Sequence, residues 1–150
     1  MKHPTTPAIH RLLGAVVLSA SLVLAGCGGG GEIEVVATDL DIGVTVAGSN
    51  LARASTGQFL QVVAGVGQTI EFDANEAVSW SFSVNGSPLF VNGTTVDVGG
   101  VTITQVQLDP GRVVLQSTFY GPALLPIEVV LVATSNFDRA QVSTIQLSLR

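Results

Sequence analysis

Histidine, lysine and cysteine are almost missing from this chain. After residue 26 there is no histidine and no lysine, and Cys27 is the only cysteine in the sequence. The absence of histidine after residue 26 excludes a Ser-His-Asp or Cys-His catalytic site there, and it also excludes a zinc site with histidine ligands. With one cysteine no intramolecular disulfide forms, so the stability of the folded part has to come from packing.

Positive charge is scarce as well. All eleven acidic residues lie after Cys27, where the basic residues are Arg53, Arg112, Arg139 and Arg150, and this part has a net charge of −7. Because binding to nucleic acid depends on Lys and Arg that neutralise phosphates, we expect no nucleic-acid partner. The same composition offers no electrostatic attraction to anionic lipid, so membrane attachment would depend on Cys27.

Residues 1–26 have the layout of a cleaved, helical secretory signal peptide. Lys2, His3, His10 and Arg11 form a basic start, and an apolar run of 14 residues, Leu12 to Ala25, follows. Positive charge stays on the cytoplasmic side while the apolar run enters the translocon. A retained transmembrane helix needs about 20 apolar residues, so it is the weaker interpretation.

The apolar run closes on Leu24-Ala25-Gly26-Cys27, which resembles the lipobox of bacterial lipoproteins residue for residue. The resemblance implies that Cys27 receives a diacylglyceryl group, that a lipoprotein signal peptidase cleaves before it, and that the new amine can then be acylated. Two or three acyl chains on Cys27 would anchor the protein stably. The alternative is an incidental cysteine near an ordinary cleavage site.

Residues 27–31 join the lipidated cysteine to four glycines, Gly28 to Gly31, which we interpret as a flexible tether. At about 3.5 Å per residue the glycines reach roughly 14 Å. By resemblance to the sorting rule of Gram-negative lipoproteins, Gly28 rather than Asp after the cysteine implies the outer membrane. A phosphate-binding loop is excluded here because no Gly-Lys-Ser/Thr ending follows.

Residues 32–150 are predicted to form a single all-β domain, a usual size for one core. Apolar and polar residues alternate in one segment after another, most regularly in "VSWSFSV", residues 78–84. This period of two is typical of antiparallel strands with one face in a core. Turn residues such as Asn85-Gly86 and Asp109-Pro110-Gly111 separate the segments. The pattern predicts eight to ten strands in a β-sandwich.

Three segments depart from simple alternation. "NLARASTG", Asn50 to Gly57, contains modest helix formers and is predicted to hold one helical turn. The apolar phase slips between Ile103 and Val106, which indicates a β-bulge or a strand that crosses between sheets. Pro122 and Pro126 bracket a connection between two strands.

The stretch "QVVAGVGQTIEFDANEAVSWSFSVNG", Gln61 to Gly86, resembles the A′-B-C portion of bacterial immunoglobulin-like domains, including those of the polycystic-kidney-disease type. In such domains a glycine-bearing turn precedes an "xTIxF" strand, and the next strand contains a tryptophan. The resemblance implies an antiparallel immunoglobulin-like sandwich with Trp80 as its core tryptophan. The chain lacks both a cysteine pair and the "WDFGDG" motif.

Carboxylates form two local clusters, one of Asp39 with Asp41 and one of Glu71, Asp73 and Glu76. Calcium takes six to eight oxygen ligands, so the second cluster is the candidate metal site. The alternatives are solvated charges that keep an outer face soluble and a glycosidase pair, which needs two carboxylates about 5 to 9.5 Å apart. No cofactor is expected.

Aromatic and edge features supply the remaining candidates. Trp80 and Tyr120 are candidate platforms for a sugar, although Trp80 has the phase of a core residue and a lone tyrosine usually packs at a rim. The final segment "STIQLSLR", residues 143–150, would offer a partner strand its backbone if it lies at a sheet edge. The alternative places it inside a sheet.

The sequence therefore predicts a non-enzymatic, lipid-anchored module of the bacterial cell envelope that binds or supports another envelope protein or a polysaccharide. The competing hypothesis is a carbohydrate-binding module or a carboxylate-dependent protein of the glycoside hydrolase type.

Overall fold

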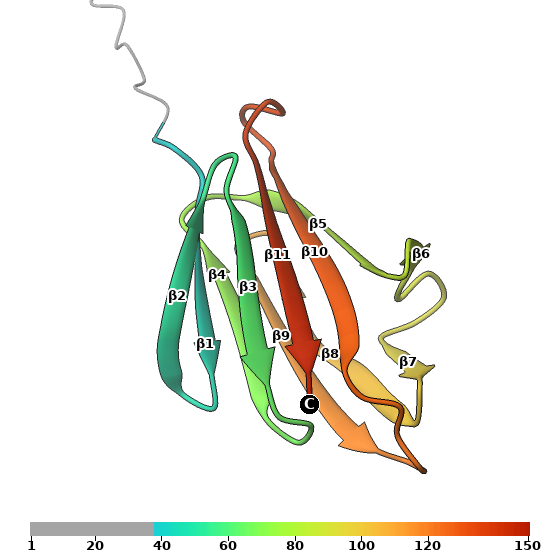
Figure 1. Cartoon of the computed structure of the whole chain (residues 1–150). Helices are drawn as coiled ribbons and strands as arrows, with labels where there is room; N and C mark the ends of the chain where they lie inside the picture. The colour runs from blue at the N-terminus through green and yellow to red at the C-terminus, as the bar shows by residue number, and fades with distance from the viewer. Residues whose placement is uncertain (1–37) are drawn as a thin grey trace, which may run out of the picture. The chain divides into compact units, whose positions relative to one another are not determined.

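The computed structural model describes residues 38–150 (Figure 1). The predicted signal peptide, residues 1–26, and the predicted tether, 27–31, lie outside the described residues. The described part contains eleven strands and no helix: β1 (Asp41–Val46), β2 (Ser49–Ser55), β3 (Phe59–Ala64), β4 (Thr69–Ala74), β5 (Val78–Val84), β6 (Ser87–Pro88), β7 (Thr95–Val98), β8 (Val101–Asp109), β9 (Arg112–Phe119), β10 (Ile127–Ser135) and β11 (Val142–Leu149).

The strands form two sheets, as predicted for an all-β sandwich. One sheet has the order β2-β1-β4-β9-β8-β7 and the other has the order β3-β11-β10-β5-β6. All neighbouring strands are antiparallel except β3 and β11, which are parallel. The β1-β4-β9-β8 and β11-β10-β5 orders are compatible with the immunoglobulin arrangement of A-B-E-D against G-F-C. The strand number exceeds the predicted eight to ten because β6 and β7 are too short to show a period.

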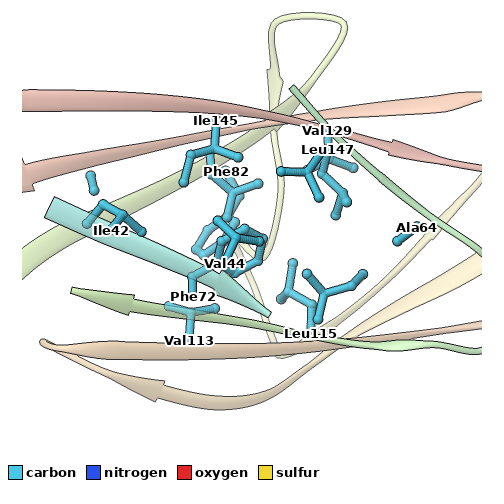
Figure 2. Packing of buried hydrophobic residues seen from close by; sticks show 14 of the residues in the cluster. Ile42, Val44, Ala64, Phe72, Phe82, Val113, Leu115, Val129, Ile145 and Leu147 are labelled. Carbon is cyan, nitrogen blue, oxygen red and sulfur yellow. The ribbon is translucent and has the colours of Figure 1, made fainter. Parts of the chain in front are cut away.

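Alternate side chains from both sheets fill the space between them. Along β10 every odd-numbered residue from Ile127 to Ser135 is buried, and β1 alternates in the same way. Figure 2 shows Ile42, Phe72 and Leu115 from the six-stranded sheet packed against Phe82, Ile145 and Leu147 from the other sheet. Each fully buried side chain of this size contributes roughly 1.5–3 kcal/mol through the hydrophobic effect.

The predicted helical turn at Asn50–Gly57 is wrong. Ser49–Ser55 form β2, whose residues pair with β1 from Asp41 to Val46, and Ala54 is fully buried. Pairing with a neighbouring strand and burial of one face override the weak helix propensity of this segment. The predicted irregularity after Ile103 is confirmed, because the β8–β9 register shifts between Gln105 and Gln107.

The last strand does not offer a free edge. β11 lies between β10 and β3 and pairs with both along its length. The hypothesis that residues 143–150 accept a partner strand is therefore wrong, and the alternative of an interior strand is correct. β3 occupies the position beside β11 because its inward residues Val62 and Ala64 are buried in the same core.

Replacement of Phe72 tests the importance of the shared core. Phe72 is completely buried, so Phe72→Ala should lower the free energy of unfolding by about 3–5 kcal/mol. Phe137→Ala is the matched control because that phenylalanine is 79% exposed, and a change within about 0.5 kcal/mol is expected. Equilibrium urea denaturation measures both values, and equal losses would contradict the described core.

Candidate functional site

Trp80 lies beside a shallow hollow of about 290 Å³, which is lined by Val78, Trp80, Leu108, Asp109 and Pro110. The tryptophan belongs to β5, packs against the core and is only partly buried. Its indole Nε1 donates a hydrogen bond of 3.1 Å to the backbone oxygen of Asp109. This bond ties β5 of one sheet to the end of β8 in the other and fixes the ring at the rim of the hollow.

The chemistry available in this hollow is limited. Asp109 is the only carboxylate among its lining residues, and that carboxylate accepts a hydrogen bond from the Gln107 amide. A glycosidase needs two carboxylates on either side of the sugar. The hollow therefore offers an aromatic edge and apolar contacts rather than an acid and base pair.

Tyr120 is placed at the other end of the sandwich. It follows β9, is 59% exposed, and its backbone N–H donates a hydrogen bond of 3.1 Å to the oxygen of Gly100, where β8 begins. Trp80 instead contacts Asp109, where β8 ends. Since β8 separates them along its length, the two candidate aromatic platforms do not form one site.

Two of the three predicted calcium ligands form ion pairs with an arginine. Glu71 and Asp73 point outward from β4, and Arg112 on β9 is the register partner of Asp73. The Arg112 guanidinium contacts Glu71 through Nη2 and lies 3.4 Å from Asp73 through Nε. These side chains are 29–50% exposed, so the pairs contribute about 0–1 kcal/mol, yet they place a cation where calcium was predicted.

The other carboxylates do not complete a metal site. Glu76 lies beyond β4, and its Oε1 is buried without a hydrogen-bond partner. Asp41 pairs with Arg53 at 2.8 Å, and Asp39 contributes a backbone oxygen to the amide of Asn75. Within residues 38–150 no three His, Cys, Asp or Glu side chains gather to hold a metal ion, so the calcium hypothesis gains no geometric support.

An exposed apolar loop connects β9 to β10. The apolar loop is defined as the last residue of β9 with the connection that follows it, residues 119–126 with the sequence "FYGPALLP". It exposes Phe119, Tyr120, Leu124 and Leu125, and Leu124 is 81% exposed. Sequence reasoning identified Tyr120 and the two prolines but missed the cluster. The feature of the sequence that could have revealed this cluster is four large apolar residues within eight positions, in a segment without charge and without the two-residue period of a strand.

The apolar loop is held against the turn between β7 and β8. Leu124 N–H donates a hydrogen bond of 2.9 Å to the oxygen of Gly99, in addition to the bond between Tyr120 and Gly100. A Cβ atom at Gly100 would lie 2.3 Å from the Pro122 oxygen, and the φ angle there is +85°. Gly100 is therefore required both by its backbone conformation and by the close approach of the loop.

No helix within residues 38–150 has the length and apolar character needed to span a bilayer. Cys27, the predicted lipid attachment site, lies outside the described residues.

Calcium titration tests the metal hypothesis directly. Because the Arg112 guanidinium contacts both Glu71 and Asp73 and offsets one of their two negative charges, we expect added Ca²⁺ to produce no binding heat and no change in Tm. Arg112→Gln is the companion variant, and it should lower the free energy of unfolding by about 0–1 kcal/mol. A saturable rise in the Tm of the unaltered protein with Ca²⁺ would contradict this expectation.

Intrinsic fluorescence tests the sugar hypothesis, because Trp80 is the only tryptophan. Its N–H is already bonded to Asp109 and much of the ring packs on the core, so we expect neutral oligosaccharides to leave the emission unchanged. A saturable emission shift that Leu108→Asp abolishes would instead support a carbohydrate-binding site.

Comparisons with known proteins identified no relative of this chain. No protein-family model, no curated protein and no solved structure matches the chain. What the site does has to be inferred from the residues of this sequence and their arrangement.

Proposed function

We propose that this protein is a lipoprotein of the bacterial cell envelope, anchored in the outer membrane through Cys27, and that its β-sandwich is a non-enzymatic binding or structural module. The observation that carries the proposal is Leu24-Ala25-Gly26-Cys27 at the close of a 14-residue apolar run. A lipidated cysteine at this position leaves the sandwich tethered to the bilayer by a short chain.

The arrangement of the carboxylates supports a non-enzymatic role. Asp41 pairs with Arg53, and Glu71 and Asp73 pair with Arg112, all on the outer face of one sheet. Glu128 on the other sheet accepts hydrogen bonds from Gln146 at 2.9 Å and Ser148 at 2.8 Å. These acids bind neighbouring strands to one another instead of converging on a cleft.

The competing function is carbohydrate binding at the Trp80 hollow. It is favoured by the partly exposed indole ring beside Leu108 and Pro110, since sugars stack on apolar ring faces. The glycoside hydrolase version is less well supported because the hollow contains only the Asp109 carboxylate.

The anchor is tested by Cys27→Ser expressed in a Gram-negative host. The wild-type protein should incorporate radiolabelled palmitate and lose the first 26 residues. The Cys27→Ser variant has no thiol to acylate, so it should accumulate as an unprocessed, unlabelled precursor. Mass spectrometry of the mature N-terminus and gel autoradiography measure both effects.

Gly28→Asp is the matched control. It keeps the cysteine and should therefore label with palmitate and mature normally, while membrane fractionation should move it from the outer to the inner membrane. Normal maturation of Cys27→Ser, or an unmodified thiol in the wild-type product, would contradict the proposal.

A further inference from the structure

The two ends of the sandwich differ in charge. At one end lie the connections β1–β2, β3–β4, β5–β6, β7–β8 and β9–β10, and none of them contains a charged side chain. The β1–β2 and β3–β4 turns and the apolar loop lie together at the bottom of Figure 1. We call this end the loop end. The charged groups near it belong to a strand or to the terminus: Glu128 lies near the start of β10 beside Leu124, and Arg150 ends the chain with its backbone bonded to Ala64 and Val66.

The opposite end is acidic. Asp39, Glu76 and Asp138 lie in the segments that precede β1 or connect the strands there, and Arg139 is the one basic residue in the same described segments. The chain enters β1 from this end, after Thr38. An anionic lipid surface would repel the three acids of these segments, whereas the connections of the loop end contain no acid.

The apolar loop has the composition of a segment that enters a bilayer interface. Phe119 and Tyr120 combine aromatic rings with a phenolic group, which suits the boundary between headgroups and acyl chains, and Leu124 and Leu125 add exposed aliphatic surface. The loop also presents few unpaired backbone donors. Tyr120 and Leu124 donate to the β7–β8 turn, and the two prolines have no N–H group, which lowers the cost of leaving water.

We propose that the apolar loop inserts into the interface of the same bilayer that holds the lipid anchor, so that the acidic end faces away from the membrane. This inference rests on the proposed anchor at Cys27. The eleven residue-to-residue steps from Cys27 to Thr38 can span at most about 40 Å, whereas a nine-residue strand such as β8 is about 30 Å long. The connecting chain is therefore long enough for both contacts to be made at once.

The anchor and the loop play complementary roles in this arrangement. The sandwich has no basic cluster to attract anionic lipid, so the loop alone would bind a membrane weakly. The tether raises the effective concentration of the loop at the surface, which makes a weak insertion sufficient. The result is a fixed orientation of the sandwich rather than an independent attachment.

Tryptophan depth measurements test the insertion. The mature lipidated protein, carrying Trp80→Phe to remove the native signal, is reconstituted into vesicles of phosphatidylcholine and phosphatidylglycerol with brominated acyl chains. Leu124→Trp in this background should show a blue-shifted emission and at least threefold stronger bromine quenching than Phe137→Trp. The two positions are a matched pair because they are 81% and 79% exposed and lie at opposite ends.

A second measurement begins with the native sequence, so that its main comparison does not depend on the folding of any variant. Amide hydrogen exchange should show that residues 119–126 are protected in the vesicle-anchored protein relative to unlipidated protein free in solution. The exchange of residues 136–141 should be the same in both. Leu124→Asp with Leu125→Asp should abolish this protection without releasing the protein from vesicles, since the anchor is intact.

The outcomes separate the anchor from the insertion. A protein that fails to float with vesicles contradicts the lipid anchor. A protein that floats but shows equal quenching at positions 124 and 137, and no protection of residues 119–126, overturns the insertion and leaves the anchor standing.

Discussion

The burial of alternate side chains between two sheets is the constraint on which this structure depends. Phe72, Leu131 and Leu147 are completely buried although they come from three strands in two different sheets. With no disulfide to help, this shared layer has to supply the stability of the sandwich. Each strand therefore commits one face to the core, and only its other face and the connections are available for charge or for contact with other molecules.

Charge is distributed unequally over the surfaces that remain. The strands of the five-stranded sheet contain one charged residue, Glu128, whereas the six-stranded sheet contains the ion pairs of Arg53 and Arg112. The ends are equally unlike, because the connections of one end are uncharged and the other end is acidic. Because of this distribution, the two faces and the two ends of the sandwich differ electrostatically, and the molecule therefore has a direction. For a protein proposed to be tethered to a membrane, a direction is functionally important because it decides which surface meets the bilayer and which surface meets other envelope components.

The candidate sites were predicted from the sequence only in part. The inward phase of Trp80 and the strand-end position of Tyr120 follow from local alternation and turn residues, and both agree with the structure. The neutralisation of Glu71 by Arg112 was not predicted, because the two residues are 41 positions apart and meet only when β9 pairs with β4. The exposure of Leu124 was also missed, since an uncharged loop has no periodic signal.

The strand content and the inward face of most strands were determined by the sequence alone, because each depends on residues that are neighbours along the chain. The proposal of an anchor at Cys27 rests on the sequence in the same way. Only the tertiary structure decided that β11 is an interior strand and that its neighbour β3 runs parallel to it. It also decided which acids pair with arginines and which connections, the uncharged or the acidic ones, gather at each end of the sandwich. These features depend on contacts between distant segments, and a local pattern of two-residue period is compatible with many such pairings.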